Sequence, residues 1–237
     1  MRYAIGEIVL VVIGILIALQ INNWNEVRKD RATEQELLKS LKIDFSETKT
    51  RLKETMKLQN TVISHSTRLL TLFETNHLLE QKDSIPEFVI FGALSWWRAE
   101  PVTGTFDAMV STGNIDLLKN KKLRRYLSEF DAEIKSGFED HEYSIDLLTQ
   151  LTIEQSAYPF NLLHDGYRKE SGLAEIKDSD EKNKNLVDCL NALKNNERFF
   201  GFLASKLAME RNRLERQEKM MLFADNILTI IDTELKK

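Results

Sequence analysis

Residues 3–26 read YAIGEIVLVVIGILIALQINNWNE. Between Ile8 and Leu19 the only residue without an apolar side chain is Gly14. With the apolar residues on either side, the run approaches the roughly 20 residues that a helix needs to cross a bilayer. The stretch therefore predicts a membrane-spanning helix at the start of the chain.

Aromatic residues mark both ends of this stretch. Tyr3 and Trp24 would lie about 31 Å apart along an α-helix, close to the hydrocarbon thickness of a membrane. Tyrosine and tryptophan prefer the membrane–water interfaces, so this pair is predicted to anchor the helix at each end. The sequence at residues 18–20 is a poor match to a signal-peptide cleavage site. Residues 1–25 are therefore predicted to be an uncleaved anchor and residues 26–237 a helical domain outside the bilayer.

One face of the predicted span carries polar and small residues. Glu7, Gly14 and Ala18 follow the three-and-four spacing of a single helical face. Gly14 and Ala18 form a small-xxx-small pair, which allows two membrane helices to approach closely. Glu7 has three interpretations: it reaches water at the membrane edge, it contributes to a contact between subunits, or it belongs to a proton or ion pathway. This face predicts a homo-oligomer or a complex with another membrane protein.

Basic residues lie mainly after the span. Arg2 precedes it, whereas Arg28, Lys29 and Arg31 follow it. The positive-inside rule alone would place the following domain in the cytoplasm.

Two stretches carry a resemblance to known proteins. Residues 3–26 and, less specifically, residues 105–120 (TFDAMVSTGNIDLLKN) are similar to a family of uncharacterised bacterial single-pass membrane proteins. The resemblance implies a cytoplasmic N-terminus and a C-terminal domain across the membrane. It implies no activity, and therefore no catalytic residues. Following it, the chain is predicted to lie in a bacterial inner membrane with its domain in the periplasm, against the indication of the local charges.

The rest of the chain favours long helices. It has three prolines and nine glycines among 237 residues, and residues 25–79 contain neither. Mainly apolar residues recur every three or four positions in that stretch and again in residues 200–235. The predicted core positions of the first stretch are Leu37, Leu41, Phe45, Thr48, Leu52, Met56, Gln59, Val62, Ser66, Leu69 and Phe73. Those of the second are Phe200, Leu203, Leu207, Glu210, Leu214, Gln217, Met221, Ala224, Leu228, Ile231 and Leu235. A third periodic stretch follows Asn120, which is a good N-cap residue. Its predicted core positions are Leu123, Leu127, Phe130, Ile134, Gly137, His141, Ile145, Leu148 and Thr152. These patterns predict an all-α antiparallel bundle.

Short elements are predicted between the long helices. Ser84, followed by Pro86, favours the start of a short helix. A second short helix over residues 106–110 is expected to end at Gly113. Residues 177–185 are highly charged and predict a loop or the start of a helix.

Composition limits the classes of function. The net charge of −4 argues against a nucleic-acid binder, which usually carries a basic face. The sequence lacks the metalloprotease, phosphate-loop and nucleophile-elbow motifs, so no enzyme activity, metal or other cofactor is predicted. The single cysteine, Cys189, is expected to be a small core residue.

Four polar residues occupy positions that the helical pattern assigns to the core: His141, Glu210, Gln217 and Gln59. Buried polar groups need hydrogen-bond partners. Three interpretations follow: a satisfied polar layer that fixes the register of the helices, a small-molecule pocket between them, or an error in the assigned register.

Two adjacent tryptophans, Trp96 and Trp97, lie between the long helices. They are interpreted either as a hydrophobic cap on one end of the bundle or as a patch that faces a ligand or a partner.

The sequence as a whole predicts a structural or protein-interaction role. The expected partners are the lipid bilayer and either a second copy or another membrane protein, and no nucleic acid. The alternative is a sensory or small-ligand-binding module that acts through a partner protein.

Overall fold

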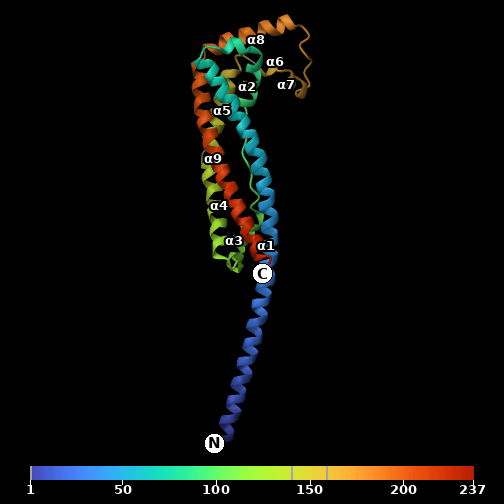
Figure 1. The fold of residues 1–237 in the computed structure, drawn as a ribbon, viewed down its shortest axis with the longest axis vertical. Coiled ribbons are helices and arrows are strands. Elements are labelled where there is room, and N and C mark those ends of the chain that lie inside the picture. Colours follow the sequence, from blue (N-terminus) through green and yellow to red (C-terminus); the bar gives the residue numbers. More distant parts are fainter. Residues whose placement is uncertain (1, 140, 159) are drawn as a thin grey trace. The chain divides into compact units, whose positions relative to one another are not determined.

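The computed structural model describes residues 2–139, 141–158 and 160–237, with side chains from Leu10 onward except at residues 138 and 139 (Figure 1). All regular elements in these residues are helices, which confirms the predicted all-α fold. In chain order they are α1 (Arg2–Glu74), the 3₁₀-helix η1 (Leu78–Ser84), α2 (Ile85–Phe88), the π-helix η2 (Val89–Ala93), α3 (Gly104–Thr112), the 3₁₀-helix η3 (Asn114–Leu117), α4 (Lys121–Glu139), α5 (His141–Gln155), α6 (Phe160–Leu163), α7 (Asp165–Glu170), α8 (Ser179–Lys194) and α9 (Glu197–Glu234).

The longest element, α1, is a single helix of 73 residues. Because the chain has no proline or glycine between Gly14 and Glu74, no helix-breaking residue interrupts α1 after the apolar run. Beyond its end, Asn76 adopts a left-handed backbone with φ of 60°, and His77 N donates to the Leu72 carbonyl at 2.9 Å. Asparagine is one of the few residues that accept this conformation at a helix end.

The chain divides into two compact units. Unit 1 contains residues 1–47, 102–128 and 224–237, and unit 2 contains residues 48–101 and 129–223. The helices α1, α4 and α9 each have residues in both units.

In unit 1, α1 and α9 run antiparallel. Gln35 Nε2 donates to the Glu234 carbonyl at 3.2 Å, and further along α1 Lys42 pairs with the earlier residue Asp232 at 2.7 Å. Buried leucines and isoleucines from α1, α4 and α9 form the core of this unit: Leu38, Leu41, Leu123, Leu127, Ile227 and Ile231.

The start of α4 is held by Asn120. Its Oδ1 accepts from Leu123 N at 3.0 Å, which makes Asn120 the N-cap that the sequence predicted. Its Nδ2 donates to Glu234 Oε1 at 2.8 Å. Next to it, Lys119 N donates to Glu34 Oε1 at 2.7 Å. These bonds fix the start of α4 against both α1 and α9.

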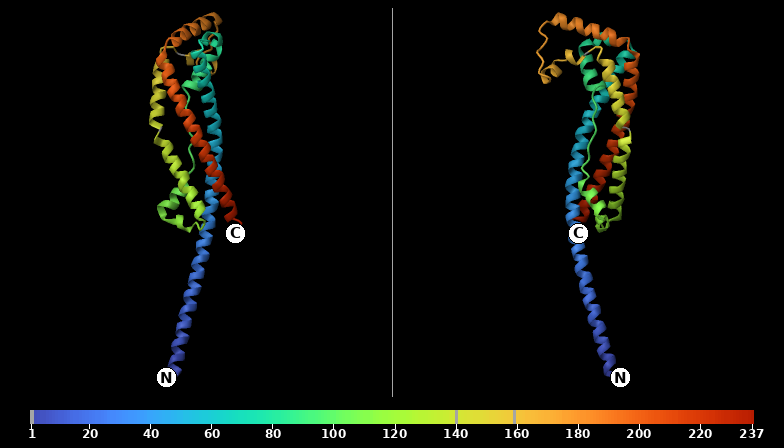
Figure 2. Two further views of the ribbon diagram at one scale, coloured as in Figure 1. Left: turned by 60° about the vertical axis from the view of Figure 1, so that its left-hand side comes forward. Right: turned by 180° about the vertical axis from the view of Figure 1, so that it is seen from behind.

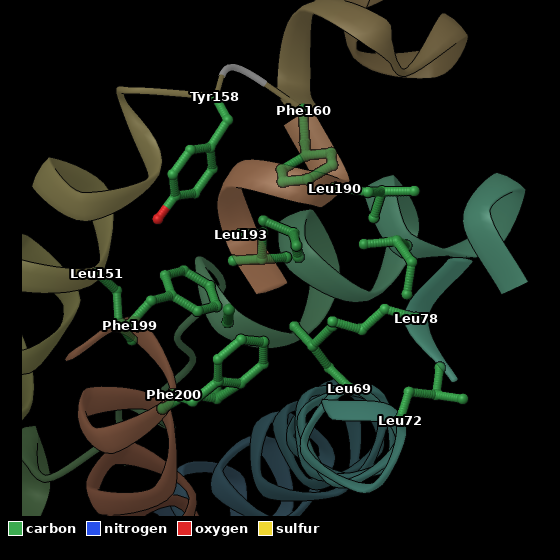
Figure 3. Close-up of a cluster of buried hydrophobic side chains, with 14 of the residues drawn as sticks. Leu69, Leu72, Leu78, Leu151, Tyr158, Phe160, Leu190, Leu193, Phe199 and Phe200 are labelled. Carbon is green, nitrogen blue, oxygen red and sulfur yellow. The ribbon is translucent and has the colours of Figure 1, made fainter. Parts of the chain in front are cut away.

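The main hydrophobic cluster lies in unit 2 (Figure 3). It is formed by α1, η1, α5, α6, α8 and α9 through Leu69, Leu72, Leu78, Leu151, Phe160, Leu190, Leu193, Phe199 and Phe200, among others. Phe200 also stacks on Phe73, with ring centroids 3.6 Å apart. Figure 2 shows α8 lying across the ends of α1 and α9 in this unit. Cys189 of α8 packs against the cluster as a half-buried residue.

The buried face of α5 differs from the prediction. The pattern extended from α4 assigned Ile145 and Thr152 to the core, but both are exposed. The residues that α5 buries are Ser144, Leu147, Leu151 and Gln155. Because α5 is a helix separate from α4, its buried positions are shifted by one residue from those predicted by extending the α4 pattern.

The short elements agree with the sequence in part. The short helix α2 begins after Ser84 with Pro86 in its first turn, as predicted, although the Ser84 side chain makes no capping hydrogen bond. Gly113 ends α3 with φ of 74°, as predicted. Residues 177–185 contain the start of α8, where the Asp178 carboxylate accepts from two backbone N–H groups of the first turn.

Candidate functional site

Three charged residues of α9 lie on one face of the helix in the interior of unit 2. Lys206, Glu210 and Arg213 are spaced four and three residues apart, which makes them neighbours along that face. Lys206 and Glu210 have no exposed surface, and Arg213 is half-buried. Glu210 Oε1 lies 3.1 Å from Lys206 Nζ, and Glu210 Oε2 lies 2.8 Å from Arg213 Nη1. One carboxylate therefore pairs with two cations.

A glutamine of α1 reaches the same carboxylate. Gln59 Nε2 donates to Glu210 Oε2 at 2.5 Å and to the Glu210 backbone carbonyl at 2.9 Å. Gln59 has no exposed surface. The structure thus places two of the residues singled out in the sequence, Gln59 and Glu210, in the interior and in direct contact.

The main chain of η2 supplies a second partner for Lys206, whose Nζ donates to the Gly92 carbonyl at 3.0 Å. A π-helical turn such as η2 is a local widening of a helix that is often found at functional sites. A Cβ on Gly92 would lie 2.8 Å from Ser66 N and 2.9 Å from His65 Cβ, both in α1. The missing side chain therefore allows η2 to lie directly on α1.

A guanidinium group connects the carboxylate to α5. Arg213 Nη2 donates to Ser144 Oγ at 2.7 Å, and the Arg213 guanidinium carbon lies 4.8 Å from the centroid of the Trp96 ring. This position is favourable because the face of an indole attracts cations. The Trp96 ring lies 5.1 Å from the His141 ring. We name the hydrogen-bonded set the polar network: Gln59, the Gly92 carbonyl, Ser144, Lys206, Glu210 and Arg213.

The polar network holds two cations and one carboxylate. Burial lowers the pKa of Lys206 from its ordinary value of 10.5, and the neighbouring Glu210 opposes that shift. The Lys206 amine is enclosed, so a solute cannot reach it in this conformation. Ionic groups of this kind add little net stability, but the loss of one partner is strongly destabilising. The arrangement is therefore suited to fixing the register of α1, η2, α5 and α9.

Two of the predicted polar residues lie outside the polar network. Gln217 is 1% exposed, and neither its Nε2 nor its Oε1 has a hydrogen-bond partner among the residues that the structure describes. His141 is half-buried, and its Nδ1 has no partner within the described part of the chain either. The His141 ring contacts Trp96, which in turn contacts Arg213 of the network, and Gln217 lies two turns beyond Glu210 on α9.

Lys206 and Arg213 were missed by sequence reasoning. Both carry charges, and charged residues are mostly exposed. A signal was present in their spacing around Glu210, which matches ion pairs on a helix. The same spacing is common on solvated helix faces, so it did not indicate burial.

The two tryptophans of the predicted aromatic patch differ in burial. Trp96 is half-buried and contacts Arg213 and His141, whereas Trp97 is 45% exposed. The two rings therefore have different surroundings.

The predicted anchor forms the start of α1 in unit 1. Every large apolar side chain from Leu10 to Ile21 is 46 to 70% exposed. Gly14 and Ala18 lie among them and are also exposed, and a Cβ added to Gly14 would meet no atom within 4 Å. Among the described residues, this helix is the one that is long and apolar enough to cross a membrane.

The ends of the predicted span are described in part. Trp24 is 66% exposed, and the Arg28 guanidinium carbon lies 5.6 Å from its ring centroid. Tyr3 and Glu7 lie outside the described side chains.

The fold and the site define an all-helical protein with a buried polar network and one long exposed apolar segment. Residues 7–135 match the model of a family of unknown function, DUF6090, and the chain belongs to this family. No curated protein and no solved structure matches the chain. The matched region includes most of residues 3–26 and all of residues 105–120, the two stretches that carried the resemblance.

Proposed function

We propose that this protein is anchored in a membrane by the start of α1 and presents a helical bundle with a structural or protein-interaction role, without catalysis of its own. The main support is the exposure of every large apolar side chain from Leu10 to Ile21. In a soluble protein these side chains would be covered, because burying each one is worth about 1.5–3 kcal/mol. A bilayer supplies that cover, and a helix satisfies its own backbone hydrogen bonds there.

The continuity of α1 supports an anchor that stays attached. A signal peptide ends at a cleavage site, whereas α1 continues from the apolar run to Glu74 as one helix. Cleavage near Ala18 would cut inside that helix. We infer that the span is retained and that it ties the bundle to the membrane.

The partner of the span is proposed to be a second copy or another membrane protein, which packs on the face of Gly14 and Ala18. In a Cys189→Ala background, Gly14→Cys should form crosslinks in membranes. Leu16→Cys, about 200° around the helix, is the matched control and should crosslink much less. Equal crosslinking from the two positions, or none from Gly14→Cys, would contradict this interface.

The membrane is proposed to be a bacterial inner membrane with the bundle in the periplasm, which is the arrangement that the family resemblance implies. A tag placed after Lys237 should be cut by protease added to spheroplasts. Protection of the tag would instead place the bundle in the cytoplasm, as Arg28 and Lys29 favour.

A second candidate function is a small-ligand-binding module. The Gln217 amide favours it, because this amide is buried and has no hydrogen-bond partner among the described residues. If this amide binds a ligand, a small molecule should copurify with the protein and be lost from Gln217→Leu. If it binds none, Gln217→Leu should raise the free energy of unfolding by about 1–3 kcal/mol, because an unsatisfied buried amide is removed. Mass spectrometry of the purified protein and denaturant unfolding separate the two results.

A further inference from the structure

Cations gather at one end of unit 1. Residues 119–125 read KNKKLRR, and no acidic residue lies between Asp116 and Glu129. Lys119, Lys121 and Lys122 are all exposed. The loop before α4 and the first turn of α4 therefore present a group of positive charges to the solvent.

Hydrogen bonds place this group close to the proposed span. Lys119 N donates to the Glu34 carboxylate at 2.7 Å. Glu34 follows Trp24 by ten residues, which is about 15 Å along a helix. The exposed residues Arg28 and Lys29 lie in the turns between them. The loop before α4 thus contacts α1 about 15 Å beyond Trp24.

The C-terminus adds to the same end of unit 1. Arg31 Nη2 donates to the Glu234 carbonyl at 3.2 Å, so the end of α9 lies against the same turns of α1. Lys236 follows it and is exposed. Figures 1 and 2 show the C-terminus beside α1 at the point where that helix leaves the rest of unit 1.

Several carboxylates at this end of unit 1 form ion pairs or accept hydrogen bonds. Asp116 pairs with Arg124 at 2.7 Å. Glu234 is 6% exposed and accepts from Asn120 and Lys237. Glu26 accepts from the Asn22 amide at 3.0 Å. Residues 26–34, 116–125 and 234–237 together carry ten basic and five acidic side chains, so this end of unit 1 is positive on balance.

We propose that this surface binds the phosphate groups of anionic phospholipids in the membrane that holds the span. The surface, named the basic patch, consists of Arg28, Lys29, Lys119, Lys121, Lys122 and Lys236. The inference rests on the proposed membrane anchor.

Distance and charge both fit this partner. The headgroup layer extends about 5–8 Å beyond the hydrocarbon, and the field of an anionic surface reaches a further 10 Å or so at 0.1 M salt. Lysine side chains at the basic patch extend into that range. The patch is continuous along α1 with the apolar run, so any lipid around the span lies next to these cations. Lipid binding would hold unit 1 at the membrane surface.

Bromine quenching of Trp24 fluorescence measures which lipids surround the span. The full chain is reconstituted in vesicles of dibrominated phosphatidylcholine with increasing phosphatidylglycerol, and Trp24→Phe gives the background from Trp96 and Trp97. Phosphatidylglycerol should displace the quencher with a preference of about fivefold over phosphatidylcholine, and added salt should reduce that preference. The triple variant Lys119→Gln, Lys121→Gln, Lys122→Gln should lower the preference for phosphatidylglycerol towards one, which means no preference.

A matched control removes the same charge elsewhere. Lys177→Gln, Lys184→Gln, Lys194→Gln changes three exposed lysines of unit 2 and should keep the preference of the unaltered chain. The proposal is overturned if the basic-patch variant also keeps it, or if both variants lose it equally. A chain whose Trp24 is not quenched by brominated phosphatidylcholine alone would contradict the membrane anchor itself, which separates the two claims.

Discussion

Gly92 is a position where one missing methyl group decides a helix contact. Its Cβ would meet the backbone of α1 at 2.8 Å, and a backbone atom cannot move away cheaply. Gly92→Ala should therefore lower the free energy of unfolding by about 1–3 kcal/mol. Gly201→Ala is the control, because Gly201 is exposed on α9 with no atom near its absent Cβ. That change should stabilise the protein by roughly 0.5–1 kcal/mol, and a loss equal to that of Gly92→Ala would contradict the close approach.

Glu210 is the only carboxylate in the polar network. Glu210→Gln leaves the Lys206 and Arg213 charges without their counterion, so we expect a loss of about 3–5 kcal/mol in denaturant unfolding. Glu218→Gln, an exposed change on the same helix, should alter stability by less than about 0.5 kcal/mol. Adding Lys206→Met to Glu210→Gln should recover part of the loss. Strictly additive effects of the two changes would show that the pair is not coupled.

Glu234 links stability to acid pH in unit 1. Hydrogen bonds from Lys237 and Asn120 lower the pKa of its carboxyl below the ordinary 4.5. A depressed folded-state pKa contributes stability above the unfolded-state value, and this is lost as the pH falls through the folded-state pKa. Glu234→Gln should therefore make the fall in stability below pH 4.5 less steep. An unchanged acid profile would show that these bonds do not hold the charged form.

Individual buried residues were predicted unevenly from the sequence. Gln59 and Glu210 were found because they interrupt long apolar patterns, which is visible without a structure. Lys206 was missed because a lysine is rarely buried, and its burial depends on a carbonyl from η2, 114 positions away in the chain. The sequence does not show that a π-helical turn will present this carbonyl.

At the scale of elements, sequence periodicity is reliable where a helix is long. Along α1 it predicted the burial of Leu41, Phe45, Leu52 and Leu69 among others. On α9 it identified Leu203 and Ile231, but it assigned Met221 and Leu228 where Met220 and Ile227 are the buried residues. The predicted buried face of α5 was wrong because the periodicity of α4 does not continue into a separate helix. The helices α6 and α7 were not predicted, since four and six residues are too few to show a period.

Asn120 controls how α4 begins. Asn120→Ala removes both the cap to Leu123 N and the donor to Glu234, so the free energy of unfolding should fall by about 1 kcal/mol or somewhat more. Asn120→Ser keeps a capping oxygen and should lose less. If alanine and serine have the same stability at this position, the cap does not contribute and α4 is held by its apolar face alone.

At the scale of the molecule, α1 contains an exposed apolar segment followed by a segment that packs against other helices. Residues 10–21 expose their apolar side chains, whereas the helix from Glu34 onward buries one face in the bundle. This change of environment within one helix is the basis for the proposed anchor. The chain belongs to a family of unknown function.

Alkaline carbonate extraction of membranes, followed by the intact mass of the extracted and retained chains, tests the anchor most directly. The full-length chain, with residues 1–25 still attached, should remain in the membrane fraction. Ile13→Arg combined with Ile17→Arg places two charges in the middle of the span and should release the chain, because each charge there costs about 2.5–3.5 kcal/mol. Release of the unaltered chain, or a retained chain that lacks its apolar run, would show that residues 1–25 do not anchor the protein in the membrane.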